Sequence, residues 1–297
     1  MNFDFSDDQK FLRDEARKFL EAQCTMAQVR EVLDDDSKSH NEGVWKKIVD
    51  MGWLGAAIPE EYGGLGLGML ELCVIAEELG RTLAPVPFGS SAYFFAEALK
   101  LAGSEKQKQA LLPKIADGSV IGCIAVSEGP GEITPGTIAT RLKDGTLSGR
   151  KIPVTDGDIA THAIVLAKDG SGASLVIVDL DQSGVSRTTI KTLEPTRSHA
   201  AIRFDGAAAE LLGEAGNGMP LLDQINDRAA VLLAFEQLGG ATRCLEMATE
   251  YAKERQAFGR AIGGYQAIKH KLADMYVKNE VARSNAYYGA WALSSNA

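Results

Sequence analysis

The sequence predicts a multidomain α+β protein in which a helical domain, a β domain and a second helical domain follow one another. Apolar residues recur with a helical period from Ser6 to Ala116. Near Gly118 the pattern changes to short segments bounded by turn residues, and the helical period returns at Met219 and continues to the end. We therefore expect three domains, over residues 1–118, 119–215 and 216–297.

Composition narrows the class of protein. The 297 residues are 45% hydrophobic, which is enough for a core, and the net charge is −9 without a long run of Lys or Arg. Nucleic acids and anionic membrane surfaces are therefore poor partners. We expect no signal peptide, and no apolar run has the roughly 18–20 residues of a membrane span. The four cysteines form no CxxC motif, so we expect reduced thiols in a cytoplasmic protein (Cys24, Cys73, Cys123 and Cys244).

The first helical region has clear helix starts. Ser6 precedes Gln9 by three residues, and Ser104 precedes Gln107 in the same way, so each pair fits a capping box that satisfies free N–H groups. A further helix is predicted over Met69–Arg81, with Leu70, Val74 and Leu79 on its inward face.

The middle region is predicted to be a small antiparallel barrel or sandwich. Asp144-Gly145 predicts a tight hairpin, because this pair tolerates the positive φ of a type I′ turn. Seven segments are predicted strands: residues 120–127, 137–142, 146–154, 162–167, 174–179, 185–192 and 200–204.

The last region predicts two long helices, over residues 219–255 and 265–293, separated by a glycine-containing turn. Arg255 and Arg260 flank this turn, and a planar guanidinium near a turn is well placed to pair with a phosphate. The alternative is a solvated Arg255 with Phe258 in the core. The residues alone leave both interpretations open.

The segment from Arg255 to Ile262, followed by Gln266 and then Leu272-Ala273-Asp274-Met275, is similar to the signature of the acyl-CoA dehydrogenase family. Other segments resemble further motifs of that family in the same order, so the resemblance covers essentially the whole chain. It implies an N-terminal helical domain, a middle antiparallel β-barrel and a C-terminal helical bundle. The further segments are residues 58–66, 123–128, 149–155 and 212–218.

The resemblance also implies an activity. Members of this family are FAD-dependent oxidoreductases of fatty acid metabolism that desaturate an acyl-CoA thioester between its α and β carbons. They pass electrons to an electron-transfer flavoprotein or a similar acceptor, and they form dimers or tetramers. We therefore expect FAD, an acyl-CoA substrate and a homo- or hetero-oligomer.

Residue roles follow from the matched positions. Ile124, Val126 and Ser127 correspond to the strand along the flavin pyrimidine edge, where N–H groups and a hydroxyl can tune the ring. Thr155 matches the threonine near flavin N5, the hydride acceptor. For Val126 and Ser127 the alternative is an ordinary buried strand. A neighbouring subunit of the family supplies the residues at the FAD diphosphate and adenine side, which here are Arg255, Phe258 and Gln266.

Three positions depart from the family pattern. Residues 129–134 lack the usual Gly-Ser-Asp turn, and Pro153 replaces an aromatic residue that packs against the flavin. The sequence ends at Ala297 after two of the four long bundle helices, so we expect an incomplete C-terminal bundle that lacks the late glutamate used as a base by most members.

The identity of the catalytic base is therefore an open question. The other place where the family carries this glutamate falls near Ala229, but Glu236 is an acidic residue within an apolar stretch nearby. We predict Glu236 as the candidate base that removes the α-proton, while the alternative is a salt-bridged or exposed glutamate. Two other functions remain: a non-catalytic subunit of a hetero-oligomer, and another flavoenzyme of this fold, such as a nitroalkane oxidase or a flavin monooxygenase.

Overall fold

The computed structural model describes residues 5–295 of the chain. They form two compact units, each assembled from separate stretches of sequence. The helical unit contains residues 5–25, Gly68–Ala84 and 231–295, and the sheet unit contains Met26–Leu67 and Pro85–Ala230. The division into three consecutive domains stays a prediction. Among the described residues, no helix is both long enough and apolar enough to cross a membrane.

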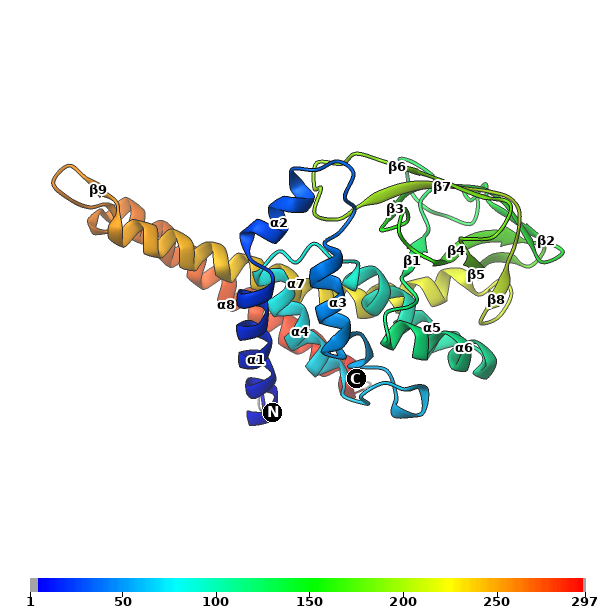
Figure 1. The fold of residues 1–297 in the computed structure, drawn as a ribbon, viewed down its shortest axis with the longest axis horizontal. Helices are drawn as coiled ribbons and strands as arrows, with labels where there is room; N and C mark the ends of the chain where they lie inside the picture. Colours follow the sequence, from blue (N-terminus) through cyan, green and yellow to red (C-terminus); the bar gives the residue numbers. More distant parts are fainter. Residues whose placement is uncertain (1–4, 296–297) are drawn as a thin grey trace. The chain divides into compact units, whose positions relative to one another are not determined.

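Four α-helices and the short 3-10 helix η4 (Ile262–Gly264) build the helical unit. The α-helices are α1 (Asp7–Gln23), α4 (Met69–Arg81), α7 (Gly218–Glu254) from Val231 onward, and α8 (Gln266–Ser295). Helix α1 begins with the predicted capping box, in which the N–H of Gln9 donates to the Ser6 hydroxyl and the Gln9 side chain accepts from the N–H of Ser6. Helices α7 and α8 lie side by side and are joined by the turn labelled β9 in Figure 1.

Helices α4 and α7 approach each other at backbone distance. A Cβ added to Gly80 of α4 would lie 1.8 Å from the backbone oxygen of Glu236. A Cβ added to Gly239 of α7 would lie 1.8 Å from the backbone oxygen of Glu77. Only residues without a side chain fit at these two places, so the pair of glycines determines how closely α4 and α7 pack.

The sheet unit has a helical part that precedes its strands. The second predicted capping box is confirmed at the start of α6, where Ser104 and Gln107 bond each other's backbone N–H groups. The helices are α2 (Met26–Leu33), α3 (Glu42–Asp50), η1 (Trp53–Gly55), η2 (Glu60–Tyr62), the π-helix η3 (Gly89–Ala96), α5 (Glu97–Ala102) and α6 (Glu105–Ala116).

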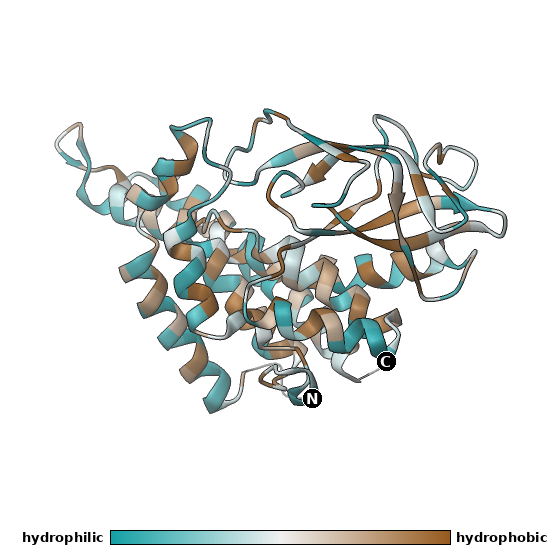
Figure 2. Cartoon of the chain, turned by 45° about the vertical axis from the view of Figure 1, so that its right-hand side comes forward, coloured by the Kyte–Doolittle hydropathy of each residue, from teal (hydrophilic) through white to brown (hydrophobic). Residues whose placement is uncertain are grey.

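One sheet accounts for all seven predicted segments and adds a short eighth strand. The pairing order is β6-β7-β3-β2-β4-β5-β8, and β1 pairs with β4. Long hydrophobic stretches follow the strands in Figure 2, as expected for a sheet with a buried face. The strands are β1 (Gly122–Ala125), β2 (Arg141–Lys143), β3 (Thr146–Thr155), β4 (His162–Asp169), β5 (Gly172–Asp179), β6 (Val185–Thr189), β7 (His199–Ala208) and β8 (Glu210–Leu212).

The sheet is not closed, so the predicted antiparallel barrel is not confirmed. Within the described residues the pairing path ends at β6 on one side and at β8 on the other, and β1 and β2 each run parallel to β4. A barrel requires its two end strands to pair with each other. Here β8 has only three residues and β6 is largely exposed, which are common features of strands that end a sheet.

Candidate functional site

A bulge in β3 determines which way Thr155 points. The alternation of β3 places Leu147 and Lys151 inward, but the pairing with β7 shifts between Lys151 and Val154. Pro153 lies in this shift and has no N–H to offer the ladder. After the bulge Val154 is buried and Thr155 is exposed, whereas an uninterrupted alternation would turn Thr155 inward.

The same inward alternation buries a lysine. The Lys151 side chain is 0% exposed, and its Nζ donates to Glu128 Oε1 at 2.8 Å and to the backbone oxygen of Val126 at 2.9 Å. Glu128 also accepts from the N–H groups of Ala139 at 2.7 Å and Thr140 at 2.9 Å. This ion pair therefore ties together both ends of the loop that follows β1.

The electrostatics of the pair are strongly shifted. Burial alone would raise the pKa of Glu128, but the hydrogen bonds from Lys151, Thr140 and Ala139 outweigh it and lower the pKa to about 2. Burial lowers the pKa of Lys151, and Glu128 opposes that effect. This pair was not among the predicted site residues, although a lysine at an inward position of a strand was a usable signal in the sequence.

The segment predicted to lie along the flavin, residues 124–127, is held by contacts of both its side chains and its backbone. The side chains of Ile124 and Val126 are half-buried and pack against an apolar cluster. The carbonyl of Ser127 accepts from the N–H of Ile152 at 2.8 Å, and the Ser127 hydroxyl donates to the carbonyl of Gly129 at 3.1 Å. The Ser127 hydroxyl thus stabilises its own turn.

The backbone N–H groups of Val126 and Ser127 in this segment remain available to bind a ligand. Val126 and Ser127 form hydrogen bonds through their carbonyl groups and the serine hydroxyl. Within residues 5–295, their backbone N–H groups donate to no acceptor. Both residues are half-buried. N–H donors of half-buried residues that bond to no acceptor within the described part of the chain suit a ligand with acceptor atoms along one edge.

Thr155 has a partner, His199, that was not among the predicted site residues. His199, the first residue of β7, lies directly opposite Thr155 in the ladder, and its Nε2 is 3.2 Å from Thr155 Oγ1. The next residue, Asp156, is buried and accepts a hydrogen bond from the Ser90 hydroxyl at 2.5 Å. Burial raises the pKa of Asp156.

In the helical unit, the turn between α7 and α8 brings three predicted residues to one tip. Arg255 follows α7, Phe258 lies in the turn between β9 (Gln256–Ala257) and β10 (Arg260–Ala261), and Gln266 begins α8. All three are exposed, and the Phe258 side chain is 97% exposed, so the alternative with Phe258 in the core is wrong. Arg255 forms no ion pair within the part of the chain that the structure describes.

The tip has a defined shape. Phe258 and Gly259 have φ values of 52° and 81°, which suit a tight hairpin turn. The Tyr265 hydroxyl donates to the carbonyl of Ala257 at 2.8 Å, and the guanidinium of Arg260 lies 4.1 Å from the Tyr265 ring centre.

The candidate base, Glu236, is a half-buried residue of α7 in the helical unit. It lies between Phe235 and Gln237, and Phe235 is fully buried against the rings of Phe5 and Tyr287. Whether Glu236 acts as a base stays a prediction.

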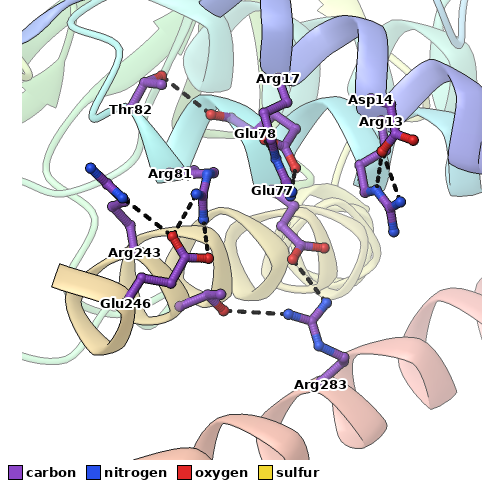
Figure 3. A network of polar contacts seen from close by, with 11 residues as sticks. Arg13, Asp14, Arg17, Glu77, Glu78, Arg81, Thr82, Arg243, Glu246 and Arg283 are labelled. Atoms are coloured by element: carbon purple, nitrogen blue, oxygen red, sulfur yellow. Dashed lines mark hydrogen bonds and ion pairs between the residues drawn. The ribbon is translucent and has the colours of Figure 1, made fainter. Parts of the chain in front are cut away.

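Other acidic residues of the helical unit form a network of ion pairs (Figure 3). Glu77 and Glu78 of α4 are buried, and they point to different partners. Glu77 Oε1 is 2.8 Å from Arg283, and Glu78 Oε1 is 2.7 Å from Arg17. Burial raises the pKa of Glu78, and the bonds from Arg17 partly oppose that effect. Arg81 donates to Glu246 at 2.8 Å. These groups are explained by packing between helices, so they are weaker candidates for a site.

Comparison with known proteins identifies the family. Residues 6–119 match the N-terminal domain of acyl-CoA dehydrogenases, and residues 216–297 match their C-terminal domain. The chain is 30% identical to the mitochondrial isovaleryl-CoA dehydrogenase of Solanum tuberosum over 302 residues, which cover 95% of this chain and 72% of that protein.

Two solved structures extend the similarity. A chain from a study of the electron transferring flavoprotein of Acidaminococcus fermentans has a TM-score of 0.92 and 28% identity, over 100% of this chain and 81% of that one. A chain of the ChsE4-ChsE5 complex from Mycobacterium tuberculosis has a TM-score of 0.90 and 28% identity, over 99% and 80%.

The fold and the matched domains together define a flavoprotein oxidoreductase. The chain belongs to the acyl-CoA dehydrogenase family.

Proposed function

We propose that the chain takes part in FAD-dependent α,β-dehydrogenation of an acyl-CoA thioester, with an electron-transfer flavoprotein or a similar protein as acceptor. The observation that carries this proposal is the edge formed by Val126 and Ser127. Both residues are half-buried, and their N–H groups bond to no acceptor among residues 5–295. The acceptor atoms along the pyrimidine edge of a flavin match such donors.

The residues of the sheet unit fit the flavin in three respects. Val126 and Ser127 would donate to the pyrimidine edge through their backbone. Thr155, turned outward by the β3 bulge, would place its hydroxyl near N5. The ion pair of Glu128 and Lys151 holds the loop that carries these donors. When bound, FAD supplies the acceptor for the hydride that leaves the β carbon.

The proton that leaves the α carbon requires a base, and we propose Glu236 for this role. A carboxylate suits the task when its surroundings remove water from it. Glu236 is half-buried next to the fully buried Phe235.

An oligomer is part of the proposal. Arg255, Phe258 and Gln266 lie exposed at the α7–α8 tip, from which they would reach the FAD of a neighbouring subunit. Helices α7 and α8 also expose apolar side chains that a partner would cover. These are Met247, Tyr251, Met275, Tyr276, Val277, Val281 and Tyr288.

The function is tested by product formation. The purified chain is incubated with FAD, an artificial electron acceptor and a set of acyl-CoA thioesters that differ in chain length and branching. The proposal expects an enoyl-CoA, two hydrogen atoms lighter than one of the substrates, in the mass spectrum. No enoyl-CoA from any thioester, in a protein shown to hold FAD, would contradict it.

A second candidate function is a subunit that supports FAD in a partner without reacting itself. The ChsE4-ChsE5 structure is described as a complex, which makes a two-chain assembly a reasonable comparison. The absence of a Gly-Ser-Asp turn in residues 129–134 favours the same idea. It predicts that FAD binding and enoyl-CoA formation appear only when a second, different chain is added.

A further inference from the structure

His199 is positioned to act on Thr155 through a single hydrogen bond. The two residues are direct partners on β7 and β3, and Thr155 Oγ1 lies 3.2 Å from His199 Nε2. The other ring nitrogen, Nδ1, lies 3.0 Å from the backbone oxygen of Arg197. Both ring nitrogens are therefore engaged, and the chemistry of their partners limits where the protons lie.

The carbonyl of Arg197 can only accept a hydrogen bond, so Nδ1 must carry a proton. In a neutral histidine this leaves Nε2 without a proton, and Nε2 then accepts from the Thr155 hydroxyl. In a cationic histidine Nε2 also carries a proton and donates to Thr155 Oγ1, which frees the hydroxyl proton of Thr155 for another acceptor.

We propose that His199 is a positioning residue whose charge decides whether the Thr155 hydroxyl donates to the histidine or to the flavin. This inference rests on the proposed function, which places Thr155 beside flavin N5. Protonation of His199 gives the flavin a donor at that edge, and deprotonation removes it. A hydrogen bond to a ring nitrogen changes the electron affinity of the cofactor, so the pair couples pH to redox potential.

The charged groups on the neighbouring segments are engaged with partners of their own. Asp156 follows β3, is buried, and accepts from Ser90. Asp158 accepts from the Ser198 hydroxyl at 2.5 Å. Arg197 precedes β7 and donates to the backbone oxygen of Val86. On the side of β6, Lys191 is paired with Asp36.

The first test reads the protons directly in protein without cofactor. The chain has four histidines, so selective ¹⁵N labelling and long-range ¹H–¹⁵N NMR distinguish their tautomers. The signal that disappears in His199→Gln identifies His199. At high pH we expect the proton on Nδ1. A proton on Nε2 instead would overturn the inference, whatever the protein does with flavin.

The second test measures the midpoint potential of bound FAD between pH 5 and 8, where a histidine can change its charge. We expect an additional step in the pH profile that is lost in His199→Gln and in Thr155→Val. His162→Gln is the matched control, because His162 lies 3.1 Å from a different threonine, Thr161, and should keep the step.

The outcomes of these tests distinguish the role of His199 from the proposed FAD-dependent function. A protein that binds FAD and keeps its step in His199→Gln overturns the role of His199 alone. A protein that binds no FAD, alone or with a partner, overturns the proposed function and this inference with it.

Discussion

At the scale of single residues, Glu128 is the side chain that ties the loop after β1 to β3. Its carboxylate holds Lys151 and two backbone N–H groups. Glu128→Gln leaves the charge of Lys151 buried without its counter-ion, and the free energy of unfolding at neutral pH should fall by about 3–5 kcal/mol. Urea denaturation measures this change.

The loss of unfolding free energy in Glu128→Gln should depend on pH. The pKa of Glu128 is lowered to about 2 in the folded protein, against about 4.3 for a free glutamate. The carboxylate therefore stabilises the fold fully above about pH 5, and this contribution is lost as the pH falls towards about 2. Glu132→Gln, at an exposed glutamate of the same loop, should change stability by less than about 0.5 kcal/mol. Equal stability of the Glu128 and Glu132 variants would show that the ion pair does not hold the loop.

Glu236 is the second residue with a defined test. Glu236→Gln keeps the size of the side chain and removes the carboxylate that we propose as the base. Flavin reduction by substrate should slow by at least about a hundredfold, the lower range for the loss of a general base. Glu250→Gln, at an exposed position of the same helix, is the control and should react at the parent rate. A Glu236 variant that also reacts at the parent rate would make this residue structural.

At the scale of elements, the crossing of α4 and α7 depends on two glycines. Gly80→Ala or Gly239→Ala would drive a methyl group into the facing backbone, and each should destabilise the protein by about 1–3 kcal/mol or more. Gly240→Ala is the control, because its Cβ would lie 3.4 Å from the backbone oxygen of Gly80, at ordinary contact distance. It should be neutral or stabilising by up to about 1 kcal/mol, as for Gly to Ala in a helix. Thermal unfolding of the three variants decides the matter, and a Gly239→Ala protein as stable as Gly240→Ala would contradict the close packing.

Elements with a local cause were predictable from the sequence. The two capping boxes, the two long helices and all seven strand segments follow from spacing within a few residues. Barrel closure is not confirmed, because it depends on whether strands far apart in the sequence pair. The bulge at Pro153 had a signal, since proline cannot join a ladder. The pairing of His199 with Thr155 had none, because it depends on the register of β7 against β3.

At the scale of the whole molecule, the proposed function requires an assembly in which the α7–α8 tip of one chain contacts the FAD bound by another chain. Arg255→Ala should weaken FAD retention by about 1.5–3 kcal/mol, the value of hydrogen bonds to a charged group. Lys253→Ala, at an exposed lysine near the same tip, is the control and should retain FAD as the parent does. FAD release is followed by fluorescence, together with the mass of the assembly from light scattering. Unchanged FAD affinity in Arg255→Ala would show that Arg255 is only a surface charge.

The central claim is that this chain holds FAD for the oxidation of acyl-CoA. The most direct measurement is the visible spectrum of the protein reconstituted with FAD, together with a partner chain if one is required, before and after acyl-CoA is added without oxygen. The account predicts a flavin spectrum that stays with the protein through gel filtration and bleaches when a suitable thioester is added. A protein that stays colourless under these conditions would contradict it.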